Sequence, residues 1–169
     1  TVNFVQPSAQ AVALNRVLGP DVSVIQGALN ANGQVFLVNP HGVLFTPTAQ
    51  VNVGGIVAST LQLRKEDFMA GNYRFSGSSA NAIVNRGHIT ATGDGAQGGS
   101  VALIAANIRT EGSLTAQGGQ VLLGAGSEVL LDLGGTVSLS VTQGALDTLI
   151  EQGGAIRADG GLVYLSAKS

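Results

Sequence analysis

The sequence predicts an all-β protein of the parallel β-helix type, in which short strands wind into stacked coils. Glycine accounts for 25 of the 169 residues, about twice its usual share of roughly 7%. Charged residues are only 11% of the chain, against an average near 25%. Glutamate and lysine are scarce, which disfavours a helical bundle. Glycine follows no three-residue period, which excludes collagen.

A repeated motif is the third observation. It reads Gly-Gly-x-Val-x-Leu, and its four copies are Gly98–Ala105, Gly118–Ala125, Gly134–Val141 and Gly160–Ala167. The second glycines stand at 99, 119, 135 and 161, which gives steps of 20, 16 and 26. A second element alternates with it at Gly87–Ala91, Gly112–Ala116 and Gly154–Ala158, with steps of 25 and 42. The longer step is close to two repeats.

The two elements have the chemistry that stacked coils require. Alternation of apolar and small or polar residues gives each strand one apolar face. Glycine permits the sharp corners between strands. Coils of about 21 residues stack with a strand spacing of about 4.8 Å, so the chain predicts about eight coils and a rod about 35–40 Å long. The alternative is a β-sandwich of hairpins, and Asn32-Gly33 has the dipeptide that favours a local hairpin.

The amino-terminal half is less regular. We expect a strand at Thr1–Val5, and the segment Ser8–Leu18 is compatible either with a helix capped by Ser8 or with a strand. Further strands are predicted at Val24–Leu29 and Gly33–Val38. The first thirty residues are expected to cap the open end of the rod, where strand edges would be unpaired.

A dense turn signal follows at Asn39-Pro40-His41-Gly42. Strands are predicted at Val43–Phe45, Val51–Val53 and within Gly54–Leu61. The charged segment Arg64–Gly71 is expected to leave the rod as an exposed loop or a short helical turn. Residues Asn72–Ser76 are then predicted to form a strand on its flank.

Charge and cysteine content exclude several classes of function. The net charge is −2 and no basic cluster is present, which argues against nucleic acid as a partner. Cysteine is absent, so disulfides, thiolate nucleophiles and Cys-ligated metals are excluded. This composition is compatible with passage through an oxidising periplasm. No apolar run approaches the ~18 residues of a membrane-spanning helix.

The segment Asn30–Val43 carries a specific resemblance. It reads Asn-Ala-Asn-Gly-Gln-Val-Phe-Leu-Val-Asn-Pro-His-Gly-Val and resembles the amino-terminal secretion domain of two-partner secretion exoproteins, the TPS or haemagglutination activity domain. Adhesins such as filamentous haemagglutinin, haemolysins and contact-dependent toxins belong to this family. The opening Val-Asn-Phe-Val-Gln-Pro-Ser and the segments Ala13–Val17, Ala58–Leu61 and Ile83–Ile89 are similar to the family as well. His41 stands where the family pattern has Asn, and both residue types tolerate strained turns.

The resemblance implies a right-handed parallel β-helix with an amino-terminal cap and small β elements outside the helix. Residues 1–169 would form one secretion domain, with residues 1–30 in the cap, as a fragment of a much longer exoprotein. The resemblance further implies export through the periplasm of a Gram-negative bacterium to the surface or medium. The expected partner is an outer-membrane barrel transporter with POTRA domains. The full-length protein would contact a host or bacterial surface receptor.

The residues Asn30, Asn32, Gly33, Asn39, Pro40, His41 and Gly42 are the candidate functional motif. They are either recognised directly by the transporter or needed for a tight turn, because Pro fixes φ, Asn bonds its own backbone and Gly relieves strain. We expect the structural role to be the direct one. Loss of export after mutation would then follow from misfolding.

Other polar residues are weaker candidates. Asn15, Asn85 and Asn107 either cap corners of the coils or are ordinary loop residues. No metal or other cofactor is expected, because His41 and His88 have neither Cys nor a carboxylate cluster nearby. Asp94 lies in a single Gly-rich segment that predicts a turn more than a calcium site.

Two other function classes remain as alternatives. A polysaccharide-cleaving β-helix enzyme needs converging acids, but the ten acidic residues are scattered and none recurs at coil spacing. We therefore expect no enzymatic activity. A carbohydrate- or surface-binding adhesin module would favour an aromatic stripe, whereas the seven Phe and Tyr residues lie mostly in the first half of the chain.

Overall fold

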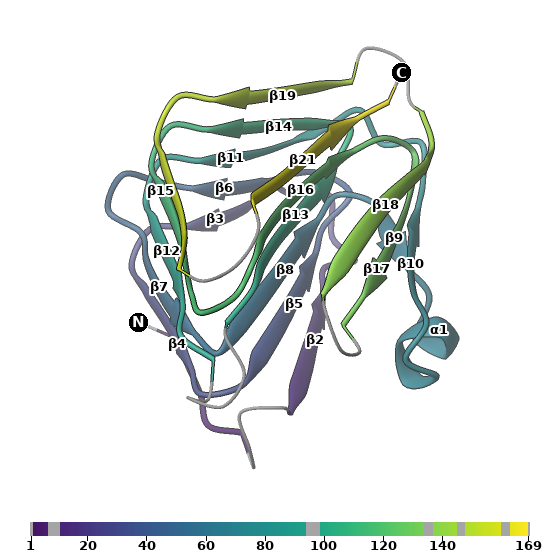
Figure 1. Ribbon diagram of the computed structural model, residues 1–169. Coiled ribbons are helices and arrows are strands. Elements are labelled where there is room, and N and C mark those ends of the chain that lie inside the picture. The colour runs from purple at the N-terminus through teal and green to yellow at the C-terminus, as the bar shows by residue number, and fades with distance from the viewer. Residues whose placement is uncertain are drawn as a thin grey trace.

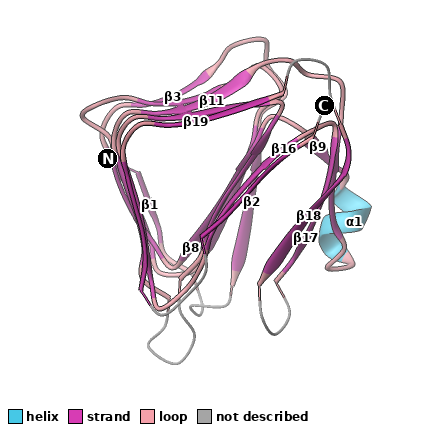
Figure 2. Ribbon diagram, turned by 45° about the horizontal axis from the view of Figure 1, so that its top comes forward, coloured by secondary structure: helices cyan, strands magenta, loops and turns pink. Residues whose placement is uncertain are grey.

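The chain folds as a parallel β-helix with a triangular cross-section, as its sequence predicts (Figures 1 and 2). The structure is a computed structural model that describes residues 2–6, 11–93, 99–133, 137–144, 148–159 and 163–168. Three sheets of parallel strands form the sides of the triangle. A fourth, antiparallel sheet lies outside one side, where Figure 2 also shows the helix.

Each complete coil of the rod contributes one strand to each side, and the last coil contributes described strands to sheets 1 and 2. Sheet 1 has the order β1 (Val2–Phe4), β4 (Ala28–Ala31), β7 (Gln50–Val53), β12 (His88–Ala91), β15 (Ser113–Gln117), β20 (Ala155–Asp159). Sheet 2 has the order β2 (Val12–Arg16), β5 (Gln34–Val38), β8 (Gly55–Ser59), β13 (Val101–Ala105), β16 (Val121–Ala125), β21 (Val163–Ala167). Sheet 3 has the order β3 (Ser23–Ile25), β6 (Val43–Phe45), β11 (Ala82–Asn85), β14 (Asn107–Thr110), β19 (Leu149–Gln152).

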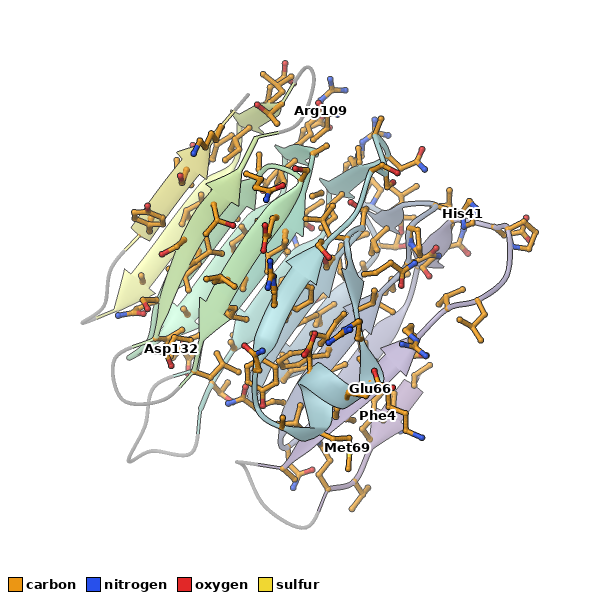
Figure 3. The ribbon with its side chains drawn as sticks, turned by 90° about the vertical axis from the view of Figure 1, so that its right-hand side faces the viewer. Phe4, His41, Glu66, Met69, Arg109 and Asp132 are labelled. Atoms are coloured by element: carbon orange, nitrogen blue, oxygen red, sulfur yellow. The ribbon has the colours of Figure 1, made fainter. Side chains whose placement is uncertain are left out.

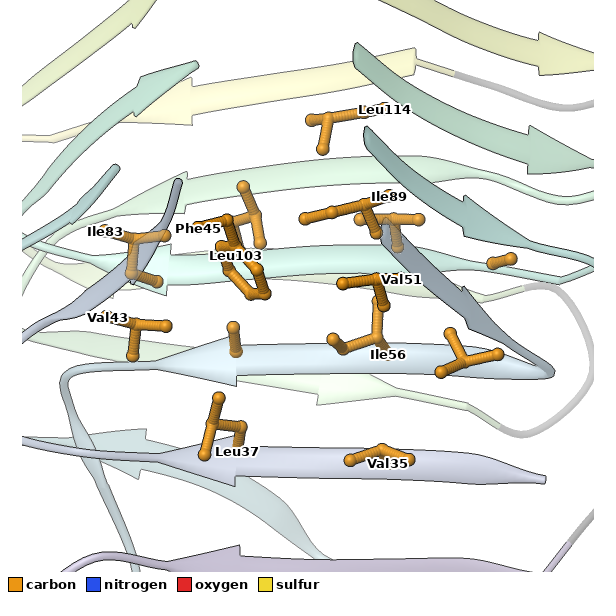
Figure 4. Close-up of a cluster of buried hydrophobic side chains, with 14 of the residues drawn as sticks. Val35, Leu37, Val43, Phe45, Val51, Ile56, Ile83, Ile89, Leu103 and Leu114 are labelled. Carbon is orange, nitrogen blue, oxygen red and sulfur yellow. The ribbon is translucent and has the colours of Figure 1, made fainter. Parts of the chain in front are cut away.

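The main core fills the inside of the triangle. Alternate side chains of every strand point inward, and strand pairing places like residues above one another, as in the register Leu103 to Leu123. Figure 4 shows this stacking for Val51, Ile89 and Leu114, which occupy one register position of sheet 1. One coil cannot bury these side chains alone, so each coil is stabilised by its neighbours.

The second core lies between sheet 2 and the antiparallel flank sheet. The flank sheet has the order β18 (Ser138–Gln143), β17 (Glu128–Asp132), β10 (Tyr73–Ser76), β9 (Gln62–Leu63). Phe36, Ile104 and Leu122 of sheet 2 pack there against Phe75 and other apolar side chains of the flank. Both faces of the central strands of sheet 2 are therefore buried.

The helix α1 (Lys65–Met69) joins β9 to β10 at the rim of this second core. Phe68 packs its ring against Phe36 at 5.6 Å between centroids, while Met69 projects into solvent (Figure 3). Arg64 Nε donates to Asp67 Oδ2 at 3.1 Å, and this hydrogen bond holds the pKa of Asp67 below its usual range. In the described part of the chain, no helix is long and apolar enough to cross a membrane.

The number of coils differs from the expectation of about eight. Sheets 1 and 2 contain six described strands each, because two coils are nearly double length. Val43 pairs with Ile83, and Asn107 pairs with Leu149, offsets of 40 and 42. Within each long coil the chain leaves the rod and forms two strands of the flank sheet, β9 and β10 in the first and β17 and β18 in the second. The prediction assumed that every residue belonged to a coil of average length.

One repeat copy was therefore misinterpreted. The copy at residues 134–141 predicted a strand of the rod, but its described part belongs to β18, which pairs antiparallel with β17. The other three copies contain β13, β16 and β21 of sheet 2, and the second element forms β12, β15 and β20 of sheet 1. Alternation alone does not distinguish a rod strand from a flank strand, since both have one apolar face.

Two local predictions also need correction. The single strand expected at Val24–Leu29 is divided between β3 and β4 by a corner at Gly27, because the chain turns there from sheet 3 to sheet 1. Asn32-Gly33 joins β4 to β5, which lie in different sheets, so it makes a corner and no hairpin. Of the two alternatives for residues 8–18, the described part adopts the strand β2.

The remaining expectations for the first half agree with the structure. Strands are present within Thr1–Val5 and Gly33–Val38, the segment Arg64–Gly71 contains the exposed helix, and Asn72–Ser76 contains the flank strand β10. Strands β1, β2 and β3 are outermost in their sheets, and a capping role for residues 1–30 remains a prediction. Ser8 and Asp94 lie outside the described residues.

Glycines at one corner allow successive coils to approach closely. A Cβ at Gly112 would overlap the carbonyl oxygen of Gly87 in the preceding coil. We predict that Gly112→Ala lowers the free energy of unfolding by about 2 kcal/mol or more, because the backbone must shift. Gly153→Ala is the matched control, since its Cβ would meet nothing closer than Thr110 O at 3.9 Å. Equal urea midpoints for the two variants would contradict this account.

The flank sheet contains an ion pair between a half-exposed arginine and a buried glutamate, and this pair provides a second prediction. Arg74 Nη2 contacts Glu128 Oε1, with the Glu128 side chain only 8% exposed. Arg74→Ala leaves that carboxylate buried without its partner and should cost about 2–4 kcal/mol in thermal unfolding. Arg109→Ala, which breaks the exposed pair with Glu151, should cost at most about 1 kcal/mol. A larger loss of stability from Arg109→Ala than from Arg74→Ala would contradict the view that the Arg74–Glu128 pair stabilises the domain more.

Candidate functional site

The segment Asn39–Gly42 forms the corner between β5 and β6. Asn39 is fully buried, and its Oδ1 accepts a hydrogen bond from the His41 backbone N–H at 2.9 Å. The Gly42 N–H donates to Asn39 O at 3.1 Å and closes the turn. Gly42 has φ 116°, a conformation that side-chain-bearing residues rarely adopt. Asn39 and Gly42 thus each have a local role in the turn.

The same turn links coils above and below it. The Asn39 amide Nδ2 donates to Asp21 O at 2.9 Å and to Ser23 Oγ at 2.8 Å in the preceding coil. On the other side, the Asn39 N–H donates to Ser59 O at 2.9 Å in the next coil. A buried amide with all these partners is costly to replace, because each lost partner leaves a polar group unsatisfied.

Pro40 extends the connection to a later segment. Its carbonyl oxygen accepts hydrogen bonds from Ser79 Oγ at 2.6 Å and from Asn81 Nδ2 at 2.9 Å. Residues 77–81 connect the flank strand β10 back to β11 of sheet 3. The Asn39–Gly42 corner is therefore a hub. It contacts the preceding coil, the next coil and the segment 77–81 that returns from the flank sheet to the rod.

His41 differs from its neighbours because the fold does not use its side chain. Its backbone N–H holds the turn, but the imidazole is exposed at the edge of the molecule (Figure 3). Among the described residues no hydrogen bond or ion pair involves that ring. An Asn or a His can therefore occupy the position without changing the turn.

A second corner contains Asn32 and Gly33, between β4 and β5. Asn32 forms two hydrogen bonds with the backbone of Gln6: Nδ2 donates to Gln6 O at 2.8 Å, and Oδ1 accepts from Gln6 N at 2.7 Å. The Gly33 N–H donates to Gln6 Oε1 at 2.9 Å. A Cβ at Gly33 would lie 2.6 Å from Ala11 O, which explains the glycine. This corner fastens residues 2–6 to the second coil.

Asn30 belongs to a polar ladder on the outer face of sheet 1. Its Nδ2 donates to Asn3 Oδ1 at 2.9 Å, and the paired residue on the other side is Asn52. The motif residues therefore form two groups at opposite ends of β5, about 20 Å apart by strand rise. Asn39, Pro40, His41 and Gly42 are brought together at one corner, and Asn30, Asn32 and Gly33 at the other.

The residues whose side chains hold these two corners in place could not be predicted from the sequence. Gln6, Ser23, Ser79 and Asn81 supply side chains to the two corners, yet none has a distinctive spacing. Of these four residues, only Gln6 lies in a segment that resembles the family, and the sequence predicted no role for it. A ladder of side-chain hydrogen bonds across coils depends on the strand register, which the sequence does not state directly.

The other candidate asparagines have different environments. Asn85 is buried at a corner, where Oδ1 accepts from Gly87 N at 3.0 Å and Nδ2 donates to Ser113 O at 3.2 Å in the next coil. Asn107 donates to Ala80 O at 3.2 Å, and Asn15 is exposed on β2. Asn85 is thus a corner cap, while Asn15 pairs with the core residue Leu37 and lines a cavity at the amino-terminal end of the rod.

Few charged residues lie near the two corners: Asp21 contacts Asn39 through its backbone carbonyl, and Arg16 pairs with Val38. No Lys, Arg, Asp or Glu occurs between Asp21 and Arg64. Glu111 and Glu151 each form an ion pair with an arginine, as Asp67 and Glu128 do. In the part of the chain that the structure describes, no three His, Asp or Glu side chains are grouped to hold a metal ion. His88 Nδ1 lies 2.7 Å from Ser113 Oγ on the outer face of sheet 1.

Comparison with known proteins places this architecture in a family. The model of the TPS secretion domain matches residues 1–169. A heme/hemopexin-binding protein of Haemophilus influenzae is 33% identical over 172 aligned residues, covering 99% of this chain and 19% of the relative. A second Haemophilus influenzae protein of that name is 47% identical over 75 residues, covering 44% of this chain and 8% of its own length.

A solved structure agrees with both. The secretion domain of HMW1 from Haemophilus influenzae superposes with a TM-score of 0.84 at 31% identity, over 96% of this chain and 46% of that chain. The chain belongs to the TPS secretion domain family. Domains of this family belong to exoproteins that Gram-negative two-partner secretion systems export, and each implies a cognate outer-membrane transporter. The family is not a known enzyme family.

The buried amide of Asn39 provides the prediction for this site. Asn39→Ala removes its bonds to the His41 N–H, Asp21 O and Ser23 Oγ, so unfolding should become easier by about 2–3 kcal/mol. His41→Ala at the same corner should change stability by no more than about 0.5 kcal/mol. Urea unfolding followed by circular dichroism measures both. A stable Asn39→Ala domain that is no longer exported would show that the amide is read directly.

Proposed function

We propose that this domain is the secretion signal of a longer exoprotein and the nucleus from which its β-helix folds outside the cell. In the periplasm, the POTRA domains of an outer-membrane barrel transporter recognise it. The observation that carries the nucleation role is the Asn39–Gly42 hub, which ties three successive segments of the chain together. Once this corner forms, each later coil has a template to pair with.

Recognition by strand addition suits the chemistry of the domain. The coils around the motif carry no charge between Asp21 and Arg64, so electrostatic steering has little to act on. Strands of an unfinished domain, whether in the rod or in the flank sheet, present free backbone N–H and C=O groups at their edge. A partner strand can pair with these groups, with side-chain pockets adding specificity.

The motif then acts on export mainly through folding. Asn39 and Gly42 are buried, so a partner cannot contact the Asn39 side chain in the folded domain. Exposed His41 at this corner and exposed Asn32 at the other corner are the motif residues that a partner can contact directly. Residues 1–169 are one secretion domain on this proposal, with residues 1–30 capping the rod.

The activity of the exoprotein resides elsewhere. This chain spans about a fifth of the length of the first curated relative, which is named for binding heme and hemopexin. We propose that the remainder carries the adhesive, haemolytic or toxic activity and contacts host or bacterial surfaces. The exoprotein passes through the periplasm to the cell surface or medium.

Binding of the isolated domain to purified POTRA domains of its cognate transporter tests the proposal. The domain should bind in calorimetry or interferometry, and excess domain in the periplasm should compete with export of the exoprotein. Because the motif coils are uncharged, we expect the dissociation constant to change less than about threefold between low and physiological salt. No binding together with no competition would refute the proposed function.

A further inference from the structure

The flank sheet is assembled from segments that are distant in the chain. Phe75 of β10 pairs with Val129 of β17, 54 positions later. Between them lie two complete strands of sheet 2, β13 and β16. The edge of β10 that faces β17 therefore has no partner until residues 128–132 arrive, although coils that precede them can already stack.

The hairpin of β17 and β18 is separable from the rod. Asn107, Ser113 and Val121 pair with residues 42 positions later in sheets 3, 1 and 2. The identical offset in all three sheets shows that the hairpin is an excursion within one coil. It contributes no strand to the three sides of the rod, so the rod can keep its register whether or not the hairpin is docked.

Docking of the hairpin closes the second core. Val129 and Leu131 of β17 and Leu139 of β18 are at most 5% exposed, over the outer face of sheet 2. Leu139 lies directly on Gly124, where a Cβ would be 2.7 Å from Leu139 Cδ2. Before docking, Ala102, Ile104 and Leu122 of sheet 2 face outward without this cover.

The strand that docks defines what the site accepts. β17 is antiparallel to β10, directs Val129 and Leu131 inward, and places the Glu128 carboxylate against Arg74. The Arg74 side chain is 54% exposed whereas Glu128 is 8% exposed. The strand that occupies this site is therefore extended, with alternating apolar residues and one carboxylate that reaches Arg74.

We propose that the edge of β10, with the outer face of sheet 2 behind it, is the surface that receives an extended strand of the transporter's POTRA domains. The β17–β18 hairpin displaces that strand when it docks, and the domain is then released. This inference rests on the proposed function and assigns the strand addition to one edge. The transporter strand carries the chemistry of β17: inward apolar residues and a carboxylate that reaches Arg74.

The β17–β18 hairpin and the transporter strand compete for one site, so the state of the hairpin should change the affinity for the transporter. The apparent affinity for the transporter equals the intrinsic affinity reduced by the fraction of molecules whose hairpin is undocked. Locking the hairpin must weaken binding, and loosening it must strengthen binding. A hairpin with a purely structural role would produce neither change.

The lock is a disulfide across the β10–β17 pair, which the absence of native cysteine makes specific. Ser76 and Glu128 are directly opposite one another in these two strands. Ser76→Cys is combined with Glu128→Cys, which leaves no charge buried and keeps Arg74 available to the carboxylate of the transporter strand. Oxidised and reduced forms of this one protein are compared for binding to purified POTRA domains. Thr90→Cys with Thr115→Cys, paired on the outer face of sheet 1, is the control disulfide.

We expect the oxidised double variant to bind about tenfold more weakly than its reduced form, with no such difference for the control. The single variant Glu128→Gln, which loses the ion pair but keeps the strand, should bind at least about threefold more tightly than the natural sequence. Equal binding by oxidised and reduced forms would overturn the assignment of this edge, as would unchanged or weaker binding by Glu128→Gln. If the natural sequence itself does not bind, the proposed function fails together with this inference.

Discussion

The stacking of coils in register is the constraint on which the rest of this structure depends. Residues 42 positions apart pair in all three sheets across the last coil, so corners must lie directly above corners. At these corners the backbones approach so closely that a side chain at Gly112 would overlap Gly87 O. High glycine content therefore produces rigidity in this fold, because it allows backbone carbonyls to meet the next coil. The low charge content follows from the same geometry, since the inner faces are apolar and a second sheet covers part of the outside.

Polar groups enter this apolar rod at corners, and there they connect coils. Asn39 and Asn85 are both fully buried asparagines whose side chains bond one turn of the backbone and an adjacent coil. Such a side chain aligns two coils before the apolar faces are complete, because its hydrogen bonds are satisfied in only one register. On the proposed function, the family motif therefore contributes to folding as well as marking the family. Exposed His41 is the motif residue whose side chain leaves the fold unaffected.

Much of the fold could be predicted from the sequence, because the apolar alternation and the Gly-Gly corners are local signals. The copies at Val101–Ala105 and Val121–Ala125 became neighbouring strands of one sheet as expected. The prediction for the third copy was wrong because β18 has the same alternation as a strand of the rod but belongs to the flank sheet outside it. A signal was present: both repeat elements return after 42 residues if that copy is omitted. Of the candidate site, the two turns were predictable from Asn, Pro and Gly, whereas the anchor Gln6 was not, since its role depends on the register between coils.

The central claim is that the Asn39–Gly42 hub and the coils it joins are the most stable part of the domain and nucleate its folding. Native-state hydrogen exchange of the isolated domain tests this most directly, because it reports the opening free energy of each strand. The account predicts that amides of β5, β6 and β8 exchange only through global unfolding, and that β17 and β18 exchange through a smaller, local opening. Fast exchange in β5 and β6 while β13 and β16 remain protected would contradict it.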